Sequence, residues 1–229
     1  MEERAEERSG RRCVVMCDSN GKGVTPDTIG NHIRREERWK WEVQVEQVFT
    51  LWGVRDKVRR GEIRVEGARV VVDCMTNDVR GTRAQRPVEP WELEERLRVV
   101  IGELRRSGAG EVVLCEMKPM RDINVVPYNI RIHALILCNE GVGGCSTQIQ
   151  HDYLKEDGYH VRPEFGSVLD RTYACAVMDR TVPCPYFDSG IYDWHTRRHW
   201  EQEWPPLWGR GMGSGPGHQV AALHAIYGR

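Results

Sequence analysis

The chain has 229 residues, of which 40% are hydrophobic and 29% are charged, and its formal net charge at pH 7 is -1. This length and apolar content are enough for one sizeable folded domain with appendages. The balanced charge does not indicate nucleic acid as a partner, and no stretch approaches the roughly eighteen uninterrupted apolar residues of a membrane span. The charged start "MEERAEERSGRR" lacks the apolar core of a signal peptide, so we expect an intracellular, cytoplasmic protein with no membrane insertion.

The eight cysteines indicate reduced thiols rather than disulfides. Four of them fall within or at the ends of apolar, strand-like runs, where free cysteine behaves as a small hydrophobic residue: Cys13, Cys17, Cys74 and Cys115. There is no Cys-x-x-Cys pair, and His195 and His199 have no nearby acid or cysteine pair to complete a metal site. We therefore expect no metal site.

Short apolar runs alternate with amphipathic stretches along the chain. In chain order, the pattern predicts a strand at 12–17, a half-buried strand within 39–53, a short helix at 56–63, a buried strand at 68–75, a long helix at 89–107, a buried strand at 110–117, a helix after Pro127, a short strand within 145–154 and a closing helix at 162–178. Strands that alternate with helices indicate βαβ units with right-handed crossovers. The predicted fold class is α/β: a three-layer α/β/α, flavodoxin-like parallel sheet of about four to five strands with helices on both faces.

The composition divides the chain into three parts. Residues 1–11 form a charged extension, residues 12–178 carry the α/β pattern, and residues 179–229 form a tail rich in Trp, Pro and Gly. The tail lacks both the helical and the strand period, and its Pro and Gly density indicates partial disorder. Its tryptophans could bind a protein partner.

Three polar segments carry candidate chemistry: "CDSN" after the first predicted strand, "MTND" after the strand at 68–75, and "DGYH" before the closing helix. Ligands of open parallel sheets bind at the carboxyl ends of the strands. A serine hydroxyl needs a base within hydrogen-bond reach to act as a nucleophile, and His160 can supply that base to Ser19. Asp157 precedes His160 by three residues and is spaced to orient its imidazole. These three residues are the catalytic candidates.

In this order and spacing, the segments resemble the SGNH, or GDSL-type, hydrolase family. That family carries Gly-Asp-Ser after its first strand, a glycine after the second, Gly-x-Asn-Asp after the third and Asp-x-x-His near the C-terminus. The candidate for the second block is Gly53 in "LWGVRDKV", and Gly166 with the helix after it matches the usual continuation of the last block. The resemblance covers roughly residues 12–178.

The resemblance implies a serine esterase that cleaves a small or short-chain carboxylic ester through an acyl-enzyme on Ser19, with no metal or organic cofactor. It also implies an oxyanion hole made of the backbone N–H groups of Ser19 and Gly53 and the side-chain amide of Asn77.

The sequence departs from the family pattern at two backbone positions. Cys17 and Met75 replace the glycines of the first and third blocks. We expect both side chains to crowd the floor of the pocket, which favours short acyl chains. Asp18 and Asp78, which neighbour the predicted site residues, are expected to hold loops by hydrogen bonds.

Two other interpretations fit the same α/β pattern. The departures at Cys17 and Met75 and the Trp-rich tail would suit a catalytically weak or inactive SGNH-like binding or accessory domain. The chain also resembles esterase-like domains of proteins encoded by mobile genetic elements. A phosphoacceptor receiver domain would use Asp18, Asp73 and Lys118, which follow or end strands. That second interpretation leaves the "DGYH" segment unexplained.

Overall fold

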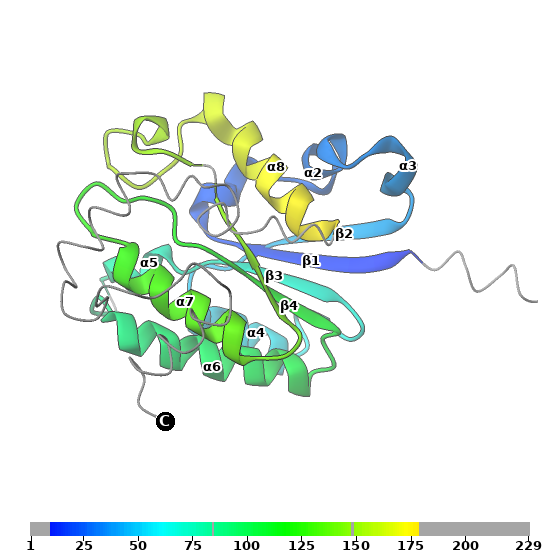
Figure 1. The fold of residues 1–229 in the computed structure, drawn as a ribbon, viewed down its shortest axis with the longest axis horizontal. Helices are drawn as coiled ribbons and strands as arrows, with labels where there is room; N and C mark the ends of the chain where they lie inside the picture. The colour runs from blue at the N-terminus through cyan, green and yellow to red at the C-terminus, as the bar shows by residue number, and fades with distance from the viewer. Residues whose placement is uncertain (1–9, 84, 148, 179–229) are drawn as a thin grey trace, which may run out of the picture. The chain divides into compact units, whose positions relative to one another are not determined.

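The computed structural model describes residues 10–83, 85–147 and 149–178 (Figure 1). Its centre is a sheet of five parallel strands in the order β2-β1-β3-β4-β5. The strands are β1 (Arg11–Cys17), β2 (Trp41–Gln47), β3 (Arg69–Asp73), β4 (Glu111–Cys115) and β5 (Val142–Cys145). This flavodoxin-like order places the topological switch point between β1 and β3, outside whose carboxyl ends doubly wound sheets bind their ligands.

Helices cover both faces of the sheet, as Figure 1 shows. On one face lie α2 (Pro26–His32) and α8 (Gly166–Val177), and on the other lie α4 (Leu51–Arg59), α6 (Pro90–Arg106) and α7 (Val126–Cys138). The predicted three-layer α/β/α architecture is confirmed. Among the helices within the described ranges, none combines the length and the apolarity needed to cross a bilayer.

The remaining elements are short and lie in the segments that connect the strands and the longer helices. They are the 3-10 helix η1 (Ser19–Gly23), helix α3 (Arg35–Arg38), helix α5 (Thr76–Arg80) and the 3-10 helices η2 (His151–Tyr153) and η3 (Pro163–Phe165).

The central strand β1 divides its side chains between two apolar cores. Val14 and Met16 pack with residues of α4, α6 and α7, whereas Cys13, Val15 and Cys17 pack with residues of α2 and α8. This alternation follows from the period of two of a β-strand. All five side chains are fully buried, and complete burial of one such large apolar side chain stabilises the fold by about 1.5–3 kcal/mol.

The long helix was predicted within one residue at each end, because Pro90 occupies its first position and Gly108 follows its end. The short helix predicted at 56–63 is wrong in its bounds. The Thr50 hydroxyl accepts the Gly53 N–H at 3.1 Å and caps α4, so this helix begins at Leu51, inside the stretch predicted to continue the preceding strand.

The last strand was also misplaced. It was predicted within 145–154, but β5 comprises Val142–Cys145, and the chain then leaves the sheet and forms η2. The sequence of β5, "VGGC", contains two glycines and gives no alternating apolar pattern that would reveal a strand.

The charged start at 1–9 and the whole tail at 179–229, with His195 and His199, lie outside the described residues. Six cysteines within the described ranges have free thiols: Cys13, Cys17, Cys74, Cys115, Cys138 and Cys145.

Candidate active site

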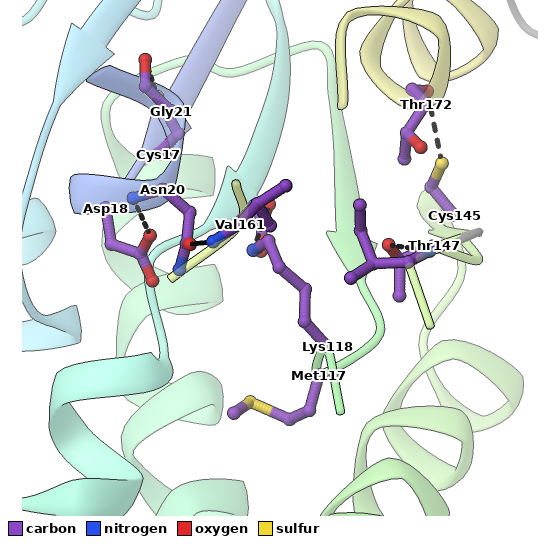
Figure 2. A network of polar contacts seen from close by, with 12 residues as sticks. Cys17, Asp18, Asn20, Gly21, Met117, Lys118, Cys145, Thr147, Val161 and Thr172 are labelled. Atoms are coloured by element: carbon purple, nitrogen blue, oxygen red, sulfur yellow. Dashed lines mark hydrogen bonds and ion pairs between the residues drawn. The ribbon is translucent and has the colours of Figure 1, made fainter. Parts of the chain in front are cut away.

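The first strand ends because the Asp18 side chain turns the backbone into η1. Its Oδ1 accepts the Asn20 N–H at 2.8 Å, and this bond caps the 3-10 helix that begins at Ser19. The Asp18 N–H in turn donates to the carbonyl of Asp73 at 3.1 Å, which anchors the turn to β3. Figure 2 shows the Asp18 carboxylate directed toward Asn20. Ser19 therefore lies at the carboxyl end of β1, beside the switch point.

The loop that carries the predicted base is held by its own aspartate. Asp157 Oδ1 accepts the backbone N–H groups of Tyr159, at 3.1 Å, and of His160, at 2.9 Å. Gly158, which lies between Asp157 and Tyr159, has φ 77°, and a Cβ at this position would lie 2.6 Å from the Cβ of Arg121. Both the left-handed backbone and the close approach require glycine here, which gives the "DGYH" segment a physical reason.

Ser19, His160 and Asp157 form a continuous hydrogen-bonded chain. Ser19 Oγ lies 2.8 Å from His160 Nε2, and His160 Nδ1 lies 2.8 Å from Asp157 Oδ2. In the tautomer that carries its proton on Nδ1, the ring donates to Asp157 and its Nε2 accepts the Ser19 hydroxyl hydrogen. The side chains of His160 and Asp157 are 26% and 36% exposed, so a solute can reach the chain of groups from solvent.

The hydrogen bonds of Asp157 keep its carboxylate ionised. Partial burial acts to raise the pKa of Asp157, but the bonds from His160 and Tyr159 outweigh it and lower the pKa from its ordinary value of 3.8 to about 2. Asp157 is thus a carboxylate at every pH near neutrality. It can hold the imidazole in one tautomer and stabilise the imidazolium that forms when His160 accepts a proton.

The three predicted oxyanion donors differ in their availability. Within the described part of the chain, no acceptor engages the Ser19 N–H. The Asn77 amide donates one of its two hydrogens to the carbonyl of Phe49 at 3.0 Å, which leaves the second. The Gly53 N–H donates to Thr50 Oγ1 inside the cap of α4, so it would have to leave that bond to bind a substrate oxygen.

Asp78 connects the elements around Asn77, as expected for a loop-holding residue. It is fully buried, and its Oδ2 accepts the Leu51 N–H at 2.9 Å at the start of α4. Its Oδ1 accepts from Arg96 of α6 at 2.6 Å and from the Gln85 amide at 3.4 Å. One carboxylate therefore joins α4, α5, α6 and the loop that follows α5.

The side chains of Cys17 and Met75, which stand where the resembled family has glycine, do not crowd a pocket. Cys17 is 0% exposed in the core under α8, and Met75 is 1% exposed in the core on the opposite face. Met75 has φ −94°, which any residue adopts, so glycine is not needed there. The expectation that these side chains narrow the pocket floor is wrong, and the short-chain preference inferred from it loses its support.

Burial also makes Cys17 chemically inert. It raises the pKa of the Cys17 thiol to about 12, so the thiol stays protonated and does not compete with Ser19 as a nucleophile.

Asp73 and Lys118 lie together, as the receiver-domain alternative required, but they form an internal ion pair. Lys118 Nζ lies 2.6 and 2.7 Å from the two Asp73 oxygens, and the Tyr173 hydroxyl donates to Asp73 at 2.5 Å. Both members of the pair are at most 5% exposed. Burial opposes the charge of Lys118, but Asp73 and Asp18 raise its pKa above the ordinary value. Because the Tyr173 hydroxyl also binds Asp73, the ion pair is not open to a ligand.

Two residues that the sequence did not single out hold the catalytic candidates in place. The Asn20 amide oxygen accepts the N–H of Val161, the residue after His160, at 2.9 Å (Figure 2). Arg121 donates to the carbonyl of Glu156 at 2.7 Å from its side chain and to that of Gly158 at 2.8 Å from its backbone. The position of Arg121 after β4 was the only sequence signal, because its partners lie about 35 residues further along the chain.

No protein-family model matches this chain, and no curated protein matches it. Among solved structures, the chain is similar to an acetyl xylan esterase named AlAXEase, with a TM-score of 0.54, 14% sequence identity, and coverage of 73% of this chain and 98% of that chain. At this identity the similarity concerns the fold alone. The described part of the chain thus has the three-layer α/β/α fold of an esterase.

Proposed function

We propose that this protein is a serine ester hydrolase of the SGNH type, which cleaves small carboxylic esters through an acyl-enzyme on Ser19. The observation that carries the proposal is the pair of 2.8 Å contacts that join Ser19 Oγ to His160 and His160 to Asp157. Serine, histidine and aspartate in this relation are the groups needed to activate a hydroxyl nucleophile.

In the proposed reaction, Ser19 Oγ attacks the ester carbonyl carbon while His160 Nε2 accepts the hydroxyl proton. The tetrahedral intermediate collapses, His160 returns this proton to the leaving alkoxide, and the acyl group remains on Ser19. A water molecule then attacks the acyl-enzyme, again with His160 as the base, and releases the acid. Asp157 keeps the imidazole oriented and stabilises its protonated form in both halves.

The oxyanion of each tetrahedral intermediate would be bound by the Ser19 N–H and the free hydrogen of the Asn77 amide. Removal of one such donor costs about 3–4 kcal/mol of transition-state stabilisation in a serine hydrolase. Gly53 remains a proposed third donor, which requires its N–H to exchange Thr50 for the substrate.

The structural comparison supports the same reaction class, because the similar solved structure is that of an acetyl xylan esterase. The mechanism needs no metal or organic cofactor, since side chains and backbone N–H groups supply every step.

The test is covalent labelling of the whole chain with a fluorophosphonate, read by intact-mass spectrometry. The wild-type chain should gain one adduct, Ser19→Ala should gain none, and His160→Ala should label at least about 10²-fold more slowly because the hydroxyl loses its base. Ser167→Ala, which removes an exposed serine at the start of α8, is the matched control and should label like the wild type.

An unlabelled but folded wild-type chain would contradict the proposal and favour a binding or accessory domain. Equal labelling of the wild type and Ser19→Ala would place the reactive group elsewhere.

A further inference from the structure

Arg80 connects the segment that carries Asn77 with the segment that carries His160. It follows Asn77 by three residues in α5, a spacing that puts both side chains on one face of the helix. Its guanidinium carbon lies 3.4 Å from the ring centroid of Tyr159, whose ring centroid lies 4.1 Å from that of His160. Stacking therefore holds the charge of Arg80 at the edge of the proposed site.

The loop after α5 forms a surface hollow of about 640 Å³ beside this stack. Three of the residues that line it are arginines, Arg80, Arg83 and Arg86, and none of the lining residues is acidic.

These arginines are not equally neutralised. Arg86 forms a two-pronged ion pair with Glu92, with nitrogen–oxygen distances of 2.5 and 2.9 Å. Arg80 and Arg83 form no ion pair with any residue in the described ranges. Two positive charges that no carboxylate of the described residues balances therefore line the hollow.

The described residues of this loop are held by close backbone contacts. Gly81 has φ 77°, and a Cβ there would lie 2.6 Å from the Pro87 ring, so the chain folds back tightly on itself. Thr82 and Gln85 exchange backbone hydrogen bonds of 2.7 and 3.2 Å, and the Gln85 amide donates to Asp78. Binding at such a preorganised loop costs little ordering entropy.

We propose that the ester substrate carries a negatively charged group, a carboxylate or a phosphate, which Arg80 and Arg83 bind while Ser19 attacks the ester carbonyl. Guanidinium groups bind both anions through paired, charge-assisted hydrogen bonds. This inference rests on the proposed ester hydrolysis for the identity of the site, but the anion preference can be measured without any turnover.

The experiment measures calorimetric binding to the full chain carrying Ser19→Ala. The probes are 4-acetamidobenzoate and 4-acetamidophenyl phosphate, which are amide analogues of anionic acetyl esters, and the neutral methyl 4-acetamidobenzoate. We expect the better anionic probe to bind about tenfold more tightly than the neutral one, and the comparison of the two anions distinguishes a carboxylate from a phosphate substrate. Adding Arg83→Gln or Arg80→Gln should remove most of this preference.

Arg64→Gln is the matched control, because it removes the same charge from an exposed arginine before β3, at the opposite edge of the sheet. It should leave the preference unchanged. Similar affinity for anionic and neutral probes, absence of measurable binding by all three, or a preference that survives the combined Arg80→Gln and Arg83→Gln changes, would overturn the inference.

The two proposals fail separately. A fluorophosphonate adduct on Ser19 without anion preference would retain the hydrolase and reject the charged substrate. Anion preference that depends on Arg80 and Arg83, without an adduct, would retain the anion site and reject the hydrolase.

Discussion

The Cys17 thiol occupies the space that a side chain at position 21 would need. A Cβ at Gly21 would lie 2.2 Å from Cys17 Sγ and 2.8 Å from Cys17 Cβ. Cys17, which stands where the resembled SGNH pattern has glycine, thus fits because residue 21 is itself a glycine.

This packing predicts a strong coupling between the two positions. Gly21→Ala should lower the free energy of unfolding by about 1–3 kcal/mol, because the added methyl overlaps the buried sulfur. The loss should shrink in a chain that also carries Cys17→Gly, which removes the opposing atoms. Urea unfolding of the wild type, both single variants and the double variant gives the coupling energy. Purely additive effects would show that the two positions do not share this space.

The hydrogen bonds from His160 and Tyr159 lower the pKa of Asp157 to about 2, so this carboxyl group does not titrate near neutral pH. Since its folded pKa lies below the ordinary value of 3.8, Asp157 contributes stability above about pH 4, and this contribution is lost as the pH falls toward 2. Loss of activity in the neutral range would therefore not report protonation of Asp157, whose assigned role is to orient His160.

Replacement of Asp157 tests this assignment through the rate. Asp157→Asn should lower kcat by on the order of 10³- to 10⁴-fold, because the amide no longer holds the imidazole in the required tautomer. The measurement is kcat for hydrolysis of 4-nitrophenyl acetate near neutral pH by the wild type and the variant. An undiminished kcat in a folded Asp157→Asn variant would show that Asp157 does not orient His160 for catalysis.

At the scale of elements, the short helix α5 acquires its position from Asp78. Five residues, Thr76–Arg80, are too few to form a stable isolated helix. The buried Asp78 carboxylate joins the first N–H of α4 and the guanidinium of Arg96 to this helix. Asn77 and Arg80, which precede and follow Asp78, are thereby held at the carboxyl edge of the sheet.

Removal of this carboxylate should loosen three elements at once. Asp78→Ala is expected to lower the free energy of unfolding by about 3 kcal/mol, because it leaves Arg96 and the start of α4 without their buried partner. Asp56→Ala is the matched control: its pair with Arg55 is partly exposed, at 31% and 42% of the two side chains, so its loss should cost about 0–1 kcal/mol. Chemical denaturation measures both. Equal losses would mean that Asp78 does not join the elements energetically.

At the scale of the whole molecule, the carboxyl ends of three strands, β1, β3 and β4, are joined by polar contacts beneath the candidate active site. Asp73 ends β3, Lys118 follows β4, and Tyr173 comes from α8 on the covering layer. The Asp73 carbonyl also binds the Asp18 N–H at the end of β1. Loops that carry Ser19, Asn77 and Arg121 therefore begin from fixed strand ends, which is the rigidity that a preorganised site needs.

The sequence alone predicted the architecture, because burial imposes periods that are visible in the chain. The strand at β3 is a continuous β-branched run, as a strand buried on both faces requires. The helix α6 shows an apolar stripe between a proline and a glycine. Local pattern failed at α4, whose start is fixed by hydrogen bonds to the Thr50 and Asp78 side chains, and at β5, whose glycines carry no period.

The site divides in the same way. Spacing and residue type singled out Ser19, Asp157 and His160, because a base and its orienting acid can share one short loop. Only the tertiary structure decided the contacts between residues distant in sequence: the Asn20 bond to Val161, the Arg121 bonds to the histidine loop and the stack of Arg80 on Tyr159. It also decided that Cys17 and Met75 point into the core. The direction of a side chain at a strand end depends on which elements pack around it, and no local pattern records those elements.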